Sequence, residues 1–415
     1  MIKTEIITIG DELLIGQVID TNSAWIGEQL NAIGIKVNQI TSISDDRSHI
    51  LKTLAEAETR ADIILITGGL GPTKDDITKV TLCEYFNTQL IFNQEAYRSI
   101  ENLFKIRGFT MTELNRKQAE VPANCKVIPN SNGTAPGMWF EKNGKIFVSM
   151  PGVPFEMKQM MTAFVLPELS GKFNSHFIFH KTILTQGGGE SMIAKIIENW
   201  EDNLPANIKL AYLPQPGMVR LRLTATGKDK YELLHKLELE TTKVQQLIPD
   251  LIYGFDNDTL ESVVGELLRS MKKTVATAES CTGGYIAHLI TSIPGSSEYY
   301  KGSVVAYANE VKEEMLGVKN ESLLTHGAVS EEVVKQMAEG VKSKLKADFA
   351  IATSGIAGPD GGTEKKPVGY TWIAIATPET VVARQFLFGE DRGRNIRKTA
   401  IMALDMLRKE LVKIG

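Results

Sequence analysis

Residues 274–286 read T-V-A-T-A-E-S-C-T-G-G-Y-I, which combines three kinds of local sequence. The apolar, β-branched run Val275-Ala276 is typical of a buried parallel strand. A tight turn over residues 279–284 follows, and an amphipathic helix then extends to about Pro294-Gly295. This order places Ser280 at the N-terminus of a helix, where unpaired backbone N–H groups and the helix dipole stabilise negative charge. Ser280 is therefore a candidate nucleophile.

The same position has a simpler use. Serine and threonine are common N-cap residues, so Ser280 or Thr282 could only cap the helix. A serine nucleophile also needs a base nearby. His288 lies about two turns along the helix and is too far away, and no lysine stands three positions after Ser280 as in an S-x-x-K dyad. This segment by itself leaves both uses open.

A second motif, Y-A-N-E-V-K at residues 307–312, contains a different candidate base. A strand is expected to end at Tyr307, and Lys312 lies on the helix that follows. Strands of a parallel sheet end at one edge, so both side chains could lie beside Ser280. A lysine desolvated in a pocket has a lowered pKa and can act as a base, while a tyrosine hydroxyl can relay a proton. A surface lysine and a core tyrosine are the alternative.

Residues 353–363, T-S-G-I-A-G-P-D-G-G-T, follow another apolar strand. Their backbone N–H groups would suit an oxyanion or a phosphate. The late basic residues Arg392, Arg394 and Arg397 could hold a phosphate, although basic residues at a helix start are more often solvated.

The N-terminal part has a similar organisation. Residues 2–67 alternate between strand and helix, which predicts a doubly wound sheet with ligands at the carboxyl ends of its strands. At that edge, residues 67–76 read T-G-G-L-G-P-T-K-D-D, which is neither a Walker loop nor a dinucleotide fingerprint. Two more glycine-rich loops occur at residues 130–137 and 151–157, and together the three predict a pocket for a phosphorylated ligand. A plain glycine turn before an acidic helix start is the alternative.

Composition limits the class of protein. A chain of 415 residues with 43% hydrophobic and 23% charged residues is expected to form two or three globular domains. The net charge of -4 argues against a dedicated nucleic-acid binder. Three distant cysteines fit no zinc or disulfide spacing, and neither a signal peptide nor a transmembrane run is evident, so we expect a cytoplasmic protein with no membrane partner.

The expected fold class is α/β. We expect two three-layer α/β domains joined by a small α+β module. The module is expected because residues 176–248 follow the order β-α-β-β-α. The predicted boundaries are 1–170, 171–254 and 255–415.

The motifs at residues 279–284, 307–312 and 354–359 look like the signature of nicotinamide-nucleotide amidases. The resemblance implies hydrolysis of nicotinamide mononucleotide to nicotinate mononucleotide and ammonia, without a cofactor. It implies Ser280 as the nucleophile, with Lys312 and Tyr307 handling protons. The substrate contacts expected on this basis are Thr282, Gly283, Ser354, Gly355, Ala357, Gly358 and Arg397.

Residues 5–157 resemble the molybdopterin-binding-like domain through their motifs at residues 10–14, 67–73 and 151–154. Joined through a KH-like module, the two domains resemble the CinA family (competence/damage-inducible protein A) over essentially the whole chain. The family implies cleavage of the ADP-ribose pyrophosphate with a divalent metal ion, Mg, Mn or Co. Its metal ligands are expected to be Asp76 first, then Asp11, Asp45 and Asp75. Its substrate contacts are expected to be Gly68, Gly69, Gly71, Thr73, Asn130, Gly133 and Thr134.

Other functions stay open at this stage. The N-terminal domain could bind a nucleotide or molybdopterin without turnover, as part of a scaffold protein. Nucleic-acid binding is not expected, because Gly187-Gly188-Gly189 follows a strand and does not join two helices as in an RNA-binding KH module. The resemblance also suggests a homodimer.

Overall fold

The computed structural model describes residues 2–73, 76–173, 177–215 and 217–414. They form two compact units, Met1–His180 with Thr224–Lys236, and Lys181–Leu223 with Leu237–Gly415. The division falls within the middle module, and each unit is described here by itself.

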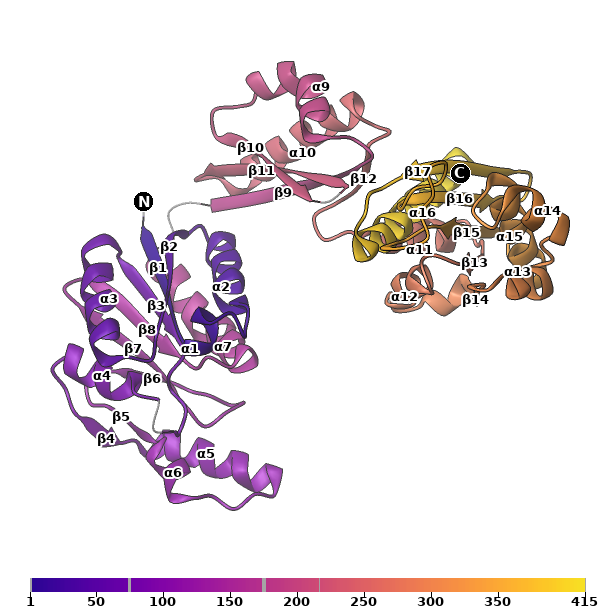
Figure 1. Ribbon diagram of the computed structural model, residues 1–415. Helices are drawn as coiled ribbons and strands as arrows, with labels where there is room; N and C mark the ends of the chain where they lie inside the picture. Colours follow the sequence, from indigo (N-terminus) through magenta and orange to yellow (C-terminus); the bar gives the residue numbers. More distant parts are fainter. Residues whose placement is uncertain (1, 74–75, 174–176, 216, 415) are drawn as a thin grey trace. The chain divides into compact units, whose positions relative to one another are not determined.

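The N-terminal domain is built on a six-stranded sheet of order β2-β1-β3-β8-β7-β6 (Figure 1). Its first four strands in this order are parallel, and β7 and β6 complete it as antiparallel strands. The strands are β1 (Lys3–Ile9), β2 (Lys36–Ile43), β3 (Ile63–Thr67), β6 (Lys126–Ile128), β7 (Gly137–Lys142) and β8 (Lys145–Met150). A separate pair consists of β4 (Leu90–Phe92) and β5 (Glu120–Pro122). The helices are α1 (Asp11–Leu14), α2 (Thr21–Ala32), α3 (Arg47–Arg60), α4 (Thr78–Tyr85), α5 (Gln94–Arg107), α6 (Glu113–Lys117), α7 (Pro154–Met160), the π-helical turn η1 (Met161–Val165) and α8 (Leu166–Lys172).

Both faces of this sheet are covered by helices. Ile6 and Leu65 belong to one apolar core, which includes residues of α2 and α7, whereas Ile7 and Ile64 belong to a second core with residues of α3 and α4. Adjacent residues of a strand point to opposite faces, so two separate cores mean two helical layers. The three-layer α/β prediction is confirmed for this domain.

The middle module contains a four-stranded sheet of order β10-β11-β9-β12. Its elements are β9 (Phe177–Gln186), α9 (Glu190–Asp202), β10 (Ile208–Gln215), β11 (Met218–Gly227), α10 (Lys230–Leu247) and β12 (Ile252–Phe255). The order β-α-β-β-α agrees with the predicted α+β module, and β12 is a further strand that the sequence pattern did not show.

The C-terminal domain has a five-stranded sheet of order β14-β13-β15-β16-β17. The first three strands in this order are parallel and the last two antiparallel. The strands are β13 (Val275–Glu279), β14 (Tyr300–Val305), β15 (Phe349–Gly355), β16 (Tyr370–Ala376) and β17 (Val381–Leu387). The helices are α11 (Leu260–Ser270), α12 (Tyr285–Thr291), the 3-10 turn η2 (Ser296–Glu298), α13 (Asn309–Leu316), α14 (Asn320–His326), α15 (Glu331–Lys344) and α16 (Arg392–Ile414).

Side chains that alternate along the strands of this sheet also form two apolar cores, one on each face. Val275 and Ile351 pack in one core with residues of α11, α12 and α16, whereas Ala276 and Ala350 pack in another with residues of α13 and α15. The carboxyl ends of the parallel strands β14, β13 and β15 therefore meet at one edge, where the motifs at 279–284, 307–312 and 354–359 begin. Within the described part of the chain, no helix is long and apolar enough to span a membrane.

Candidate active sites

Glu279, the last residue of β13, organises the turn that carries Ser280. Its side chain is completely buried, and its carboxylate accepts hydrogen bonds from the N–H groups of Gly284 (3.0 Å), Ile286 (3.0 Å) and Ala287 (2.8 Å). These are the free N–H groups at the start of α12, which a capping side chain would otherwise satisfy. Glu279 therefore takes the capping role, and neither Ser280 nor Thr282 is needed for it.

The Ser280 hydroxyl is left available by this arrangement. The backbone N–H of Ser280 donates to the Thr353 carbonyl at 3.0 Å, which fixes the turn to β15. Within the described ranges, no hydrogen bond connects the Ser280 hydroxyl or the Cys281 N–H to another residue. Burial raises the pKa of the Cys281 thiol to about 12, so the thiol stays protonated at neutral pH and is the poorer nucleophile. Thr282 turns inward, where its hydroxyl lies 2.8 Å from the Thr353 hydroxyl.

Lys312, in the first half of α13, is a buried amine. Its side chain is 1% exposed, and Nζ donates to the carbonyl groups of Ala306 (2.8 Å) and Tyr307 (3.1 Å). β14 ends at Val305 and not at Tyr307 as expected, because Val305 pairs with Glu279, the last residue of β13. Burial lowers the pKa of Lys312. A lysine with a lowered pKa has more of its neutral, proton-accepting form near neutral pH.

A cavity of about 200 Å³ at this edge brings the two groups together. Its lining includes Arg392, the first residue of α16, which donates to the Gly358 carbonyl (2.8 Å) and to the Tyr307 hydroxyl (3.3 Å). Two of the lining side chains are basic, and none of the described ones carries a carboxylate. The lining residues are Ser280, Cys281, Tyr307, Asn309, Lys312, Ala328, Val329, Ser354, Gly355, Ala357 and Arg392.

Four of the expected substrate contacts do not line this cavity: Thr282, Gly283, Gly358 and Arg397. Gly283 is exposed on the turn, and Gly358 contributes the carbonyl that holds Arg392. Arg397 is exposed farther along α16, so the arginine of this cavity is Arg392.

Four other lining residues were not among the predicted site residues, and one of them is Cys281, in the turn beside Ser280. Asn309 lies within the recognised 307–312 motif, which was a usable signal. Ala328 and Val329 belong to a loop with no such signal, because their position depends on tertiary contacts. The Ser354 hydroxyl donates to the Ala328 carbonyl (2.7 Å), and Lys366 Nζ donates to the Val329 carbonyl (2.8 Å).

The N-terminal domain has its own cavity, of about 490 Å³, at the carboxyl ends of β1, β3 and β8. The glycine loop after β3 and the loop after β8 form two of its sides, as the doubly wound pattern predicted. Of the expected residues, those lining it are Gly68, Gly69, Gly71, Asp45, Asp76 and Thr134. Glu12 and Glu156 add two carboxylates that the sequence analysis did not single out.

Asp76 closes the glycine loop on itself. Its carboxylate accepts hydrogen bonds from the N–H groups of Gly71 (2.8 Å) and Thr73 (2.9 Å) and from the Thr73 hydroxyl. A Cβ on Gly71 would overlap the Asp76 carboxylate. Each Asp76 oxygen accepts at least one of these hydrogen bonds, and a carboxylate offers about four acceptor positions, so Asp76 shapes the loop and stays a candidate metal ligand.

Asn130 has a comparable structural use. Its side chain accepts from the N–H groups of Asn132 (3.0 Å) and Gly133 (2.8 Å) and donates to Glu156 at 2.7 Å. A Cβ on Gly133 would overlap the Glu156 carboxyl group. Thr73, Asn130 and Gly133 thus shape the cavity without lining it.

Asp45 is another carboxylate of this cavity that could hold a cation. Burial raises the pKa of Asp45, and repulsion from the carboxylates of Asp11, Glu12 and Asp76 raises it further. A hydrogen bond from the Asp11 N–H (3.3 Å) acts in the opposite direction. A divalent cation would relieve that repulsion. No three His, Cys, Asp or Glu side chains form a ligand group among the residues described, and Asp75 lies outside them. Mg²⁺ commonly uses one or two carboxylates together with substrate phosphates and water, so Asp45 with a pyrophosphate fits such an ion.

Comparisons with known proteins cover the whole chain. Residues 5–171 match the probable molybdopterin binding domain, residues 180–254 the damage-inducible protein CinA KH domain, and residues 257–411 the CinA C-terminal domain.

Two full-length relatives have the same extent as this chain. A CinA-like protein of Cytophaga hutchinsonii is 50% identical over 413 residues, which cover 100% of this chain and 99% of the relative. A CinA-like protein of Flavobacterium psychrophilum is 51% identical over 416 residues, covering 99% of each. A solved structure, the competence/damage inducible protein CihA from Agrobacterium tumefaciens, is 39% identical and covers 37% of this chain and 93% of its own, with a TM-score of 0.36.

Proposed function

This chain belongs to the CinA family, and from that premise we propose that its C-terminal domain hydrolyses the carboxamide of nicotinamide mononucleotide to nicotinate mononucleotide and ammonia. One observation carries the proposal: the cavity joins an unbonded serine hydroxyl to a buried lysine of lowered pKa. A scaffold protein has no need of this combination.

The proposed chemistry begins with the neutral Lys312 amine. Ser280 Oγ attacks the carboxamide carbon while its proton passes to Lys312, directly or through Tyr307. The N–H groups of Cys281 and Ala357, two lining residues, are available to stabilise the oxyanion. The C–N bond then breaks, ammonia leaves with the proton from Lys312, and water hydrolyses the acyl-serine ester. Arg392 is the group proposed to face the substrate phosphate, and no lining side chain in the described part of the chain is a carboxylate that would repel it.

The first test is ammonia release from nicotinamide mononucleotide by the purified full-length chain. We expect one ammonia for each nicotinate mononucleotide formed. A folded wild-type protein that releases none would contradict the amidase proposal and favour a binding function for this domain.

The pH dependence tests the role of Lys312. Because burial lowers its pKa below the ordinary value of 10.5, the neutral form accumulates at lower pH than in a free lysine. We expect kcat/KM to rise with pH and to level off above that lowered pKa. In Lys312→Arg, kcat/KM should fall about 100-fold or more and lose this rise, since a guanidinium stays protonated.

The matched control is Lys335→Arg, which changes a surface lysine paired with Glu331. It should keep the wild-type profile. A rise that persists unchanged in Lys312→Arg would assign the titration to the substrate or to another group.

For the N-terminal domain we propose metal-dependent cleavage of the ADP-ribose pyrophosphate. The cavity with glycine-loop walls and the crowded carboxylate of Asp45 support this activity. A divalent cation held by Asp45 and the substrate would neutralise charge that develops on the phosphoryl oxygens. The protein residues would position the pyrophosphate through the backbone of residues 68–71.

Removal of metal should separate the two activities. We expect excess EDTA to abolish AMP release from ADP-ribose and added Mg²⁺, Mn²⁺ or Co²⁺ to restore it. Ammonia release from nicotinamide mononucleotide in the same sample should be unaffected, because serine and lysine carry out the proposed amidase steps. AMP release that survives exhaustive chelation would contradict the metal proposal, and loss of both activities would contradict the independence of the two sites.

A further inference from the structure

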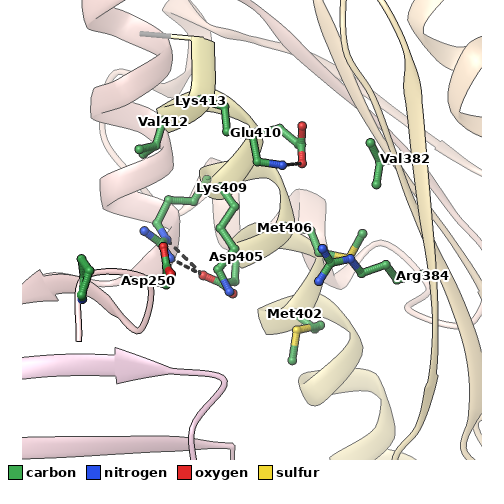
Figure 2. Close-up of a pocket in the computed structure, with 12 residues that line it drawn as sticks. Asp250, Val382, Arg384, Met402, Asp405, Met406, Lys409, Glu410, Val412 and Lys413 are labelled. Carbon is green, nitrogen blue, oxygen red and sulfur yellow. Dashed lines mark hydrogen bonds and ion pairs between the residues drawn. The ribbon is translucent and has the colours of Figure 1, made fainter. Parts of the chain in front are cut away.

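A second cavity in the C-terminal domain, of about 350 Å³, shares no lining residue with the Ser280 cavity. It lies between the edge strand β17 and the C-terminal half of α16, with Asp250 at its border (Figure 2). Alternate residues of β17 point to opposite faces of the sheet. Val381 and Ala383 pack on the core beside α15, whereas Val382 and Arg384 face this cavity. Its volume falls in the range of small-molecule sites.

The side of the cavity formed by α16 is a rigid ionic network. Asp405, 1% exposed, accepts from Arg408 Nε (3.0 Å) and Nη2 (2.9 Å), and it lies 2.8 Å from Lys409 Nζ. Arg408, 6% exposed, also donates to the Ile252 carbonyl at 3.3 Å. Buried ionised groups fixed by several hydrogen bonds keep their positions, so this wall is preformed.

The charged side chains that line the cavity include one more basic group than acidic groups. Glu410 is paired with Lys413 at 2.7 Å, whereas Arg384 forms no ion pair with any residue within the described ranges. In all, four cationic side chains and three acidic ones line the cavity. These are Arg384, Arg408, Lys409 and Lys413, and Asp250, Asp405 and Glu410.

The other walls are apolar and adaptable. Met402 and Met406 project from α16, and Figure 2 shows the Arg384 side chain extending from β17 toward Met406. Val382 and Val412 complete the apolar lining. Methionine sulfur makes favourable contacts with aromatic rings, and a guanidinium can stack on a ring as well as pair with an anion.

We propose that this cavity binds a small aromatic anion, with its ring between Met402 and Met406 and its negative group on Arg384. The site is separate from the proposed hydrolase sites, so it stands or falls independently of them. A carboxylate and a phosphate share the chemistry that Arg384 recognises, and the experiment distinguishes them.

The test uses the full-length chain with ¹³C-labelled methionine methyl groups, whose Met402 and Met406 signals are assigned with Met402→Leu and Met406→Leu. Benzoate, phenyl phosphate and the neutral benzyl alcohol are titrated separately. We expect both assigned signals to shift saturably with one or both anions, and at least 10-fold more weakly with benzyl alcohol. The anion that binds more tightly identifies the preferred negative group.

Arg384→Gln should weaken the binding of the anion at least 10-fold, a change of about 1.4 kcal/mol. Arg394→Gln, which replaces another exposed arginine outside this lining, is the matched control and should bind as the wild type does. Absent shifts, equal shifts with benzyl alcohol, or unchanged affinity in a folded Arg384→Gln protein would overturn the proposal.

Discussion

Replacing Ser280 with alanine is expected to lower kcat for ammonia release from nicotinamide mononucleotide by at least about 1,000-fold. The reason is that Ser280 is the proposed nucleophile, and its hydroxyl has no hydrogen-bond partner among the described residues, while burial keeps the neighbouring Cys281 thiol protonated. The stability of the protein should change little, because Glu279 and the backbone N–H of Ser280 maintain the turn. Ammonia assays and thermal unfolding measure the two effects.

The same chain provides an internal control for that variant. AMP release from ADP-ribose by Ser280→Ala should equal that of the wild type, since the proposed pyrophosphatase residues lie in the other compact unit. Ser292→Ala, in the residue after α12, is a matched control and should retain amidase activity. Residual amidase activity within 10-fold of the wild type in Ser280→Ala would remove Ser280 as the nucleophile.

Glu279→Ala is expected to have the second largest effect, on stability and activity together. It would leave the N–H groups of Gly284, Ile286 and Ala287 without their acceptor in a buried turn. Each unsatisfied group costs about 1–3 kcal/mol, so we expect unfolding to become easier by about 3 kcal/mol or more. Amidase kcat should fall about 100-fold, because the N–H groups and hydroxyl of the turn lose their positions.

Two further variants separate capping from the loss of a charge. Glu279→Gln keeps one side-chain acceptor and should recover part of the stability and activity lost in Glu279→Ala. Glu298→Ala removes an exposed carboxylate paired with Arg269, and both quantities should stay near their wild-type values. A folded Glu279→Ala protein with wild-type kcat would show that the turn does not depend on this carboxylate.

The capping question shows a limit of sequence reasoning. Ser280 and Thr282 were candidate caps because serine and threonine are common there, but the acceptor in the structure is Glu279, five to eight residues before its donors. The folded turn brings the Glu279 carboxylate to these distant N–H groups. Capping propensities of single residues do not describe such a turn. The strand, turn and helix themselves were predictable because their apolar periodicity is local.

The same distinction explains which site residues were found. Ser280, Tyr307 and Lys312 follow two parallel strands, β13 and β14, of one mixed sheet, so the strand topology places them at one edge. Arg392 and Arg397 both occur in α16, and choosing between them requires the position of the helix relative to the sheet. Sequence patterns predict well which edge of a sheet a residue reaches. They predict less well which side chain lines the cavity at that edge.

The N-terminal cavity shows a related limit for acidic residues. The family resemblance ranked Asp76 before Asp45 as a metal ligand, but only the folded loop shows that the Asp76 carboxylate also accepts hydrogen bonds from Gly71 and Thr73. The motifs did identify the family, and the relatives of the same extent confirm it.

The close packing of Gly71 on Asp76 and of Gly133 on Glu156 changes how natural variants of this gene should be interpreted. A methyl group at either glycine would displace a carboxylate, so the variant would behave as an acidic-residue mutant although no acidic codon has changed. Variant scoring by residue type would count such a change as mild. In this protein, a substitution at Gly71 should be judged by its effect on Asp76. A substitution at Gly133 should likewise be judged by its effect on Glu156.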